Sequence, residues 1–137
     1  RLIEMDIEPF LVGSALDCVV AQRLARRLCD KCKQPYHANP DELQALGFGF
    51  DPRMGIPTLF RPVGCQHCSN TGYRGRMALH EVMTVTEEIE RLAVARASSA
   101  EIGRTAVQQG MYTLRQDGWG KALLGMTSIE EILRVVA

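Results

Sequence analysis

Four cysteines form two pairs with identical spacing, and their thiols are the side chains of this sequence best suited to bind a metal ion. The pairs are Cys29-Asp30-Lys31-Cys32 and Cys65-Gln66-His67-Cys68. Two intervening residues allow a tight turn to direct both sulfurs of a pair at one point, so that two such turns supply four thiolates. A tetrahedral set of four sulfurs selects zinc or, less often, iron. Because four protein ligands leave no position for water, we expect a structural site and not a catalytic one.

Other uses of these thiols are two disulfides, a dithiol redox pair or an iron–sulfur cluster. The chain has five cysteines, an odd number that does not suit a framework of paired disulfides, and this favours a metal site in a reducing compartment. His37 and His67 could each replace a cysteine, but the four cysteines already complete the shell. Cys18 stands apart from the pairs, and we expect it to be a small buried apolar residue.

Composition limits the classes of protein to consider. The chain has 137 residues, of which 46% are hydrophobic and 23% charged, values that are typical of a globular protein of one or two small domains. Formal net charge is zero, so no overall field recruits nucleic acid or acidic lipid. The sequence begins at Arg1 without a methionine, in what reads as an ordered segment, and we expect a fragment of a longer protein.

The elements that must position the cysteines follow from local patterns. Pro9 favours a short helix over 9–16, whereas 18–28 fits helical spacing and strand alternation equally well. Asn39 and Pro40 predict the start of a helix that Gly47 ends. We expect a loop over 47–57, then strands over 58–63 and 75–84.

The C-terminal third of the sequence is predicted to be helical. A first helix is expected over 86–95, and three helices should follow, each opened by a capping box. The boxes are Ser98 with Glu101, Thr113 with Gln116, and Ser128 with Glu131. Gly110 and Gly125 can end the first two of these three helices. The pattern therefore predicts a small bundle of four short helices.

Four stretches in this order resemble the secretion ATPases, the hexameric motors of type II secretion and type IV pilus assembly. They are RLIEMDIEPFLVGSALDCVVAQRLARRL, LCDKCKQPY, GCQHCSNTGYRGRMALHEVM and LRQDGWGKALLGMTSIEEILRVV. The resemblance covers nearly the whole chain, and the cysteines are those of the assembly and export motors of the family.

The resemblance implies an α+β fold built from three parts. These are the terminal helix and strands of a RecA-like motor domain, an inserted tetracysteine zinc module, and a small C-terminal helical bundle. The implied boundaries are 1–28 for the end of the ATPase domain, 29–68 for the zinc module, 69–84 for the returning strand and 85–137 for the helical subdomain. In the family, 19–27 and 75–83 are antiparallel strands, which resolves the ambiguous stretch in favour of a strand.

The resemblance also implies a function. The parent protein would be a cytoplasmic ATPase, peripheral to the inner membrane, that forms a homo-hexamer and acts on an inner-membrane platform protein. It would use ATP and Mg²⁺, and zinc would be structural. The Walker A motif G-x-x-x-x-G-K-[ST] and a Walker B strand are both missing from these 137 residues. We therefore expect this fragment to be inactive alone, with no catalytic residue, and to serve subunit contact and force coupling.

Two arginines follow the second cysteine pair, in the segment that the family places near the nucleotide. Arg76, and with less support Arg74, could bind nucleotide phosphates or a neighbouring subunit, because a guanidinium binds phosphate and carboxylate in a bidentate way. The plainer reading is that surface arginines balance the negative charge of the metal-bound thiolates. An alternative for the whole chain is a zinc-ribbon module that binds nucleic acid, but zero net charge argues against it, and we expect no nucleic-acid partner.

Overall fold

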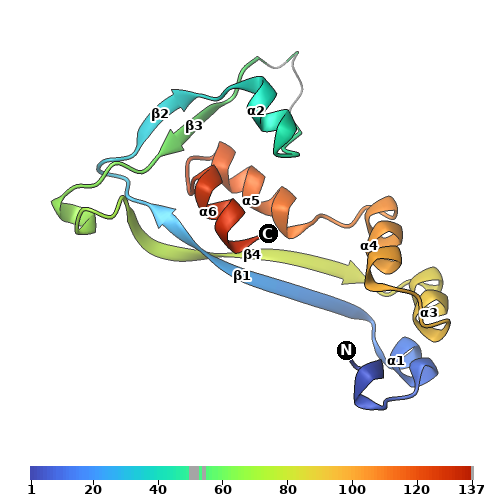
Figure 1. Cartoon of the computed structure of the whole chain (residues 1–137). Helices are drawn as coiled ribbons and strands as arrows, with labels where there is room; N and C mark the ends of the chain where they lie inside the picture. The colour runs from blue at the N-terminus through green and yellow to red at the C-terminus, as the bar shows by residue number, and fades with distance from the viewer. Residues whose placement is uncertain (50–52, 54, 137) are drawn as a thin grey trace. The chain divides into compact units, whose positions relative to one another are not determined.

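The computed structural model describes residues 1–49, 53 and 55–136. Within these residues it is a mixed α+β structure with six α-helices and four strands (Figure 1). In chain order the elements are η1 (Ile3–Met5), α1 (Pro9–Ala15), β1 (Cys18–Leu28), β2 (Gln34–His37), α2 (Pro40–Ala45), β3 (Thr58–Arg61), η3 (Gln66–Cys68), β4 (Tyr73–Thr84), α3 (Glu87–Val94), α4 (Ser99–Gln108), α5 (Leu114–Leu123) and α6 (Ile129–Val135). The loop expected over 47–57 includes 50–52 and 54, which lie outside the described residues.

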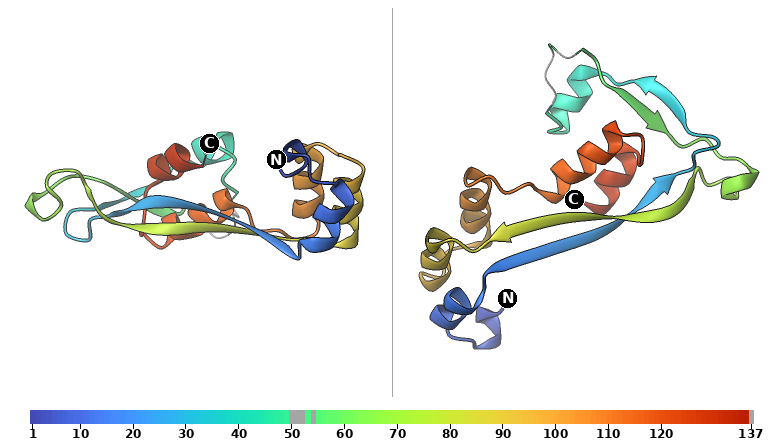
Figure 2. Two further views of the ribbon diagram at one scale, coloured as in Figure 1. Left: turned by 90° about the horizontal axis from the view of Figure 1, so that it is seen from below. Right: turned by 180° about the vertical axis from the view of Figure 1, so that it is seen from behind.

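The strands form two small sheets of two strands each. Strand β1 pairs with β4, and their arrows run in opposite directions in Figure 1. Strand β2 pairs with β3 in antiparallel register, from Gln34 opposite Arg61 to His37 opposite Thr58, and the two lie side by side in the right view of Figure 2. The ambiguous stretch 18–28 is therefore a strand. Strand β3 is shorter than expected because Pro62 follows Arg61 and has no N–H to continue the ladder.

Contacts divide the chain into two compact units. The first unit comprises 1–21 and 80–113, and the second comprises 22–79 and 114–137. Helices α3 and α4 thus belong to the first unit, whereas α5 and α6 belong to the second. The division into a motor-domain end, an inserted module and a helical subdomain stays a prediction from the family resemblance.

In the first unit, helix α3 packs against α1 and against α4. Glu90 of α3 lies directly against Gly13 of α1, where a Cβ atom would lie 2.7 Å from the Cγ atom of Glu90. Thr86 caps α3 by accepting a hydrogen bond from the N–H of Ile89 at 3.3 Å, and Ile89 is buried. No helix among the described residues is both long enough and apolar enough to span a lipid bilayer.

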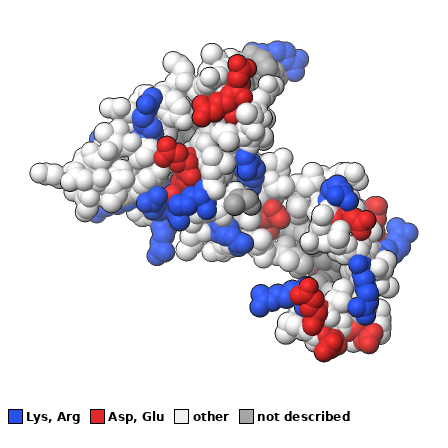
Figure 3. All heavy atoms as spheres, in the orientation of Figure 1, with Lys and Arg blue, Asp and Glu red and all other residues white. Residues whose placement is uncertain are grey.

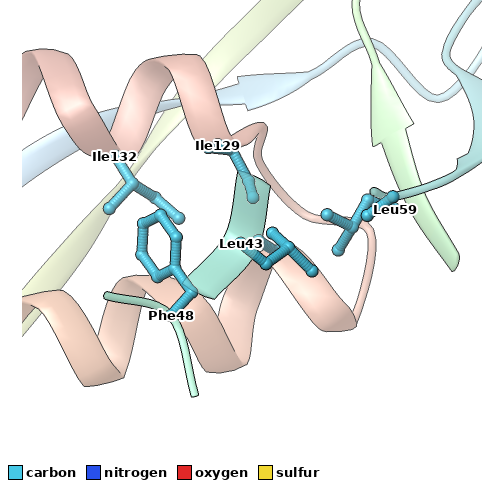
Figure 4. Packing of buried hydrophobic residues seen from close by; sticks show 7 residues of the cluster. Leu43, Phe48, Leu59, Ile129 and Ile132 are labelled. Atoms are coloured by element: carbon cyan, nitrogen blue, oxygen red, sulfur yellow. The ribbon is translucent and has the colours of Figure 1, made fainter. Parts of the chain in front are cut away.

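In the second unit, one apolar core joins segments that lie far apart in the sequence. Figure 4 shows Ile129 and Ile132 of α6 packed against three side chains from the hairpin region. These are Leu43 of α2, Phe48 of the loop that follows α2, and Leu59 of β3. Ala38 and Ala122 complete the buried cluster, and Trp119 stacks on Phe48 with ring centroids 5.2 Å apart. The hairpin β2–β3 and helix α2 therefore share their core with α5 and α6.

A second apolar cluster lies on the sheet formed by β1 and β4. Ala25 of β1 and Met77 and Leu79 of β4 are buried there, against partly buried side chains that include Leu114 and Val135. Helix α5 comes close to this cluster at Gly118. A Cβ atom there would lie 3.1 Å from Ile132 and 3.3 Å from Leu79, so a larger residue would push α5 away.

The predicted caps at Asn39 and Ser98 are confirmed, that at Ser128 is confirmed in part, and the box of Thr113 with Gln116 stays a prediction. Asn39 accepts from the N–H of Asp41 at 3.0 Å, and Ser98 with Glu101 forms the predicted reciprocal box. Ser128 caps α6 by accepting from the N–H of Glu131 at 3.2 Å, but the carboxylate of Glu131 does not return the hydrogen bond. It binds arginine side chains instead, which are stronger partners than a neutral N–H.

Cys18 is exposed and not buried as expected. It is the first residue of β1, next to Val19 and Val20, which are also exposed at 42% and 57%. The described residues leave this part of the strand uncovered, so the small apolar character of a free thiol does not bury it.

Candidate metal centre

The two cysteine pairs sit in tight turns that lie next to strands of the second unit. Cys29 directly follows β1, and its carbonyl accepts from the N–H groups of Cys32 at 3.4 Å and Lys33 at 3.0 Å. The carbonyl of Cys65 accepts likewise from Cys68 at 3.3 Å and from Asn70 at 2.8 Å. These turns are local, so the C-x-x-C spacing is sufficient to form each pair.

The four sulfur atoms form a compact cluster. All lie within 4.8 Å of one another, and three separations are 3.8 Å: Cys29 to Cys65, Cys32 to Cys68, and Cys65 to Cys68. A tetrahedron with metal–sulfur bonds of about 2.3 Å has sulfur–sulfur edges of about 3.8 Å. A disulfide would need about 2.05 Å. The cluster therefore fits a four-coordinate metal ion and does not fit disulfides.

Backbone N–H groups point at the sulfurs. Gly64 donates to the Sγ atom of Cys32 at 3.3 Å, and Cys65 and Gly72 donate to the Sγ atom of Cys68 at 3.3 and 3.2 Å. Hydrogen bonds to the charged form of an acid favour that form. These donors therefore stabilise thiolates, which are the form that binds a metal.

The surroundings shift the pKa values of Cys32 and Cys68 in opposite directions. The N–H of Gly64 lowers the pKa of Cys32, but burial and the neighbouring sulfurs raise that pKa by more, to about 11. Burial raises the pKa of Cys68, but the N–H groups of Cys65 and Gly72 lower that pKa by more, to about 6. The thiolate of Cys68 is therefore favoured, and that of Cys32 is opposed. A bound dication would supply the positive charge that all four thiolates require.

The chemistry open to this centre is limited to holding the chain together. Cys29 and Cys68 are 1% and 5% exposed, and four thiolates would complete a tetrahedral shell around zinc. Among the described residues, the only group of His, Cys, Asp and Glu side chains that could hold a metal ion is this set of four cysteines. His67, which the sequence left open as a ligand, contacts the guanidinium of Arg74 instead.

The two candidate arginines lie on β4, beyond the second pair. Arg74 donates to the carbonyl of His67 at 2.9 Å, so its guanidinium ties β4 to the second turn. Arg76 is exposed, while Met77 next to it is buried against the helices. Neighbouring strand residues point to opposite faces, so Arg76 lies on the face of β4 away from that core.

Sequence reasoning missed a buried ion cluster at the start of α6. Glu131 is 1% exposed, and its carboxylate accepts from the backbone N–H of Arg26 at 2.9 Å and from its guanidinium at 2.9 and 3.1 Å. Arg134 also binds this carboxylate, and the side chain of Arg26 covers the ring of Tyr73 at 4.2 Å. No local pattern marks this cluster, because Arg26 and Glu131 are 105 positions apart.

Comparison with known proteins gives one family of secretion and pilus assembly proteins. A family described as "Type II/IV secretion system protein" matches residues 1–134. The chain is 44% identical over 133 residues to the type IV pilus assembly ATPase PilB of Thermus thermophilus. The matched region covers 97% of this chain and 15% of that protein. It is 43% identical to the protein of the same name from Myxococcus xanthus, over 97% of this chain and 24% of the relative.

A third relative carries a different name. The type II secretion system protein E of Aeromonas hydrophila is 41% identical over 98% of this chain and 26% of its own length. The chain thus spans about a quarter or less of these relatives. Since the family match extends over nearly all of the sequence, this chain belongs to the type II/IV secretion system protein family.

Proposed function

We propose that this chain is the C-terminal, zinc-binding part of an ATPase that drives type IV pilus assembly or type II secretion. It would contact neighbouring subunits and transmit their movement, and it would not itself hydrolyse ATP. The observation that carries this proposal is the closed four-cysteine cluster in a chain of this family. A metal centre with no open position suits a rigid joint and not a catalyst.

Zinc is the metal that we propose for the cluster. The sulfur separations of 3.8 Å suit a tetrahedral ion, and zinc is the commonest ion in four-cysteine sites with this spacing. Cys29, Cys32, Cys65 and Cys68 would be its ligands. When bound, zinc would hold the two turns at one point and supply folding free energy that a short hairpin cannot obtain from its own core.

Hydrolysis of ATP would take place elsewhere in the longer protein. The 137 residues contain no G-x-x-x-x-G-K-[ST] loop, which is the usual cradle for nucleotide phosphates. ATP and Mg²⁺ would therefore bind to a part of the protein that this chain does not supply. In that setting we propose that Arg76, on the exposed face of β4, contacts nucleotide or a neighbouring subunit, with Arg74 a weaker candidate because it already binds His67.

The remaining features of the proposal come from the family. The longer protein would be a cytoplasmic homo-hexamer at the inner membrane, and it would pass movement to a platform protein there. On the face of the molecule in Figure 3, lysine and arginine side chains lie among aspartate and glutamate side chains. Such a mixed surface suits contact between protein subunits better than the continuous basic surface that nucleic acid requires.

The test is ATP turnover by this chain beside the longer protein, with elemental analysis of both. We expect one zinc ion per chain, no ATP turnover by the chain, and turnover by the longer protein that falls when Arg76 is replaced by Ala. Turnover by the chain alone would refute the proposed division of labour. Binding of DNA with a steep dependence on salt would favour the zinc-ribbon alternative.

A further inference from the structure

We infer that the cysteine cluster is energetically coupled to the segment that leads into helix α6. We call residues 125–131 the latch segment. Metal binding at the cluster would hold the latch segment in place, and the latch segment would in return strengthen metal binding. The inference rests on the proposed metal site and does not depend on the role in secretion or pilus assembly.

The first cysteine turn is flanked by two residues that bind the latch segment. Leu28 directly precedes Cys29, and its N–H donates to the carbonyl of Met126 at 2.9 Å. Lys33 directly follows Cys32, and its ammonium donates to the carbonyl of Gly125 at 2.9 Å. The cysteine turn is therefore fixed to the latch segment on both of its sides.

The second cysteine pair reaches the same segment through β4. Gly72 donates its N–H to the Sγ atom of Cys68 at 3.2 Å, and its carbonyl accepts from the N–H of Cys29 at 2.9 Å. The next residue, Tyr73, shares a hydrogen bond of 2.6 Å with the hydroxyl of Ser128. One short stretch thus connects both cysteine pairs to the N-terminal cap of α6.

The latch segment is unusually well buried for a polar stretch. Thr127, Ser128 and Glu131 are 0%, 4% and 1% exposed, and they are the only buried polar or charged side chains among the described residues. Each has a partner: Thr127 donates to the carbonyl of Arg26 at 2.9 Å, Ser128 bonds Tyr73, and Glu131 binds Arg26. Buried polar groups that lose their partners are costly, so this segment is sensitive to movement of the turns that supply them.

The fit around Gly125 leaves little freedom for adjustment. Its φ angle is +75°, and a Cβ atom would lie 2.9 Å from the ring of Phe60 and 3.3 Å from the ammonium of Lys33. The ammonium itself lies 4.9 Å from the centre of the Phe60 ring. The ring of Phe60 and the ammonium of Lys33 therefore lie directly against the backbone of Gly125, where the latch segment begins.

If metal binding fixes these turns, it must also fix the latch segment, and thermodynamic linkage requires the reverse effect of equal size. Weakening the latch should then lower the affinity for zinc, although no latch residue is a metal ligand. This reciprocal effect separates the inference from the simpler statement that metal stabilises its own turns.

The experiment compares two serine caps in the zinc-loaded chain. Ser128→Ala removes the cap of α6 and the bond to Tyr73, whereas Ser98→Ala removes an equivalent cap from α4 in the other unit. Zinc affinity is measured by competition with a chromogenic chelator. We expect Ser128→Ala to lower zinc affinity about fivefold or more, within the usual range of coupling, and Ser98→Ala to change it less than about twofold.

Two further measurements keep the inference testable if Ser128→Ala folds poorly. Tyr73→Phe keeps the cap of α6 and removes only the hydroxyl, and it should also lower zinc affinity. Hydrogen exchange on the unaltered chain should show that chelation exposes the amides of 125–135 but not those of 99–108. Equal zinc affinity in Tyr73→Phe and Ser98→Ala, or unchanged exchange over 125–135, would overturn the coupling alone. Failure of the unaltered chain to bind zinc would overturn the metal site and the coupling together.

Discussion

Replacing Glu131 by Gln should destabilise the second unit, with a cost that depends on pH. The buried carboxylate accepts hydrogen bonds from the backbone and side chain of Arg26 and from the side chain of Arg134. A glutamine amide has one oxygen and an NH2 group, so its N–H groups would face the N–H donors of Arg26 and Arg134. The variant would keep the shape of the side chain but lose the charge and at least one acceptor.

The size of the effect follows from the pKa of Glu131. Burial raises this pKa, but hydrogen bonds from Arg134 and Arg26 lower it by more, from 4.5 to about 2. A pKa lowered from 4.5 to about 2, at about 1.4 kcal/mol for each unit of pKa, corresponds to about 3.5 kcal/mol of stability at neutral pH. The arginine side chains are 44% and 56% exposed, so water screens part of this interaction. We therefore expect Glu131→Gln to cost about 2 kcal/mol at pH 7.

The sign of the pH dependence is fixed by the lowered pKa. The carboxylate contributes its full stability above the unfolded pKa of 4.5, and this contribution is lost as the pH falls toward the folded pKa of about 2. Glutamine does not titrate. The stability difference between the unaltered chain and the variant should therefore be constant from pH 7 to about 5.5, fall to roughly half near pH 3, and approach zero below about pH 2.

The assay is urea unfolding at several pH values, followed by fluorescence of Trp119. This residue is the only tryptophan of the chain, and it packs in the core that contains Ile132 of α6. The matched control is Glu130→Gln, which makes the same change on the neighbouring exposed residue of the same helix. Because Glu131 belongs to the latch segment, the zinc content is measured at each pH, and stabilities are compared only where all three proteins hold the same amount of metal. An equal cost for both variants, or a difference that does not shrink in acid, would refute the reasoning.

Three further predictions concern the metal centre. Chelation should remove one metal ion per chain, measured by elemental analysis, and should unfold residues 29–68, measured by hydrogen exchange. If these amides stay protected from exchange after chelation, a dithiol redox pair would explain the cysteines better. Cys29→Ser should weaken metal binding at least about tenfold in chelator competition, whereas Cys18→Ser should leave it unchanged, since Cys18 is not in the cluster. Gly72→Ala should cost about 2 kcal/mol or more in urea unfolding, because φ is +83° and a Cβ atom would lie 2.4 Å from Pro62; Gly103→Ala, in open space on α4, should be neutral or stabilising.

Local chemistry predicted much of the secondary structure and the whole cysteine cluster. The caps at Asn39 and Ser98 depend on residues within three positions, and the sequence displays those residues directly. The same holds for each C-x-x-C turn. Four thiols that two such turns present have few arrangements other than one cluster, so the set of candidate ligands could be read from spacing alone.

Long-range contacts account for what the sequence did not predict. The pattern Ser128-x-x-Glu131 is that of a capping box, yet Glu131 binds Arg26, which a local pattern cannot reveal. In the same way, the sequence pattern of four short helices in succession suggests one bundle. Which pair packs within which unit depends on close approaches such as Gly13 to Glu90 and Gly118 to Ile132, and these become visible only in three dimensions.

The shared core changes how the metal centre should be understood. If the segment 29–68 were an independent module, its apolar residues would pack on one another, and zinc would serve that module alone. Instead Leu43 and Leu59 pack with Ile129 and Ile132, which lie beyond β4 and the entire first unit in the sequence. The cysteine cluster therefore fixes the ends of a hairpin whose core is completed by the C-terminal helices. A metal at this point constrains α6 as well as the hairpin, because neither can move without exposing apolar surface of the other.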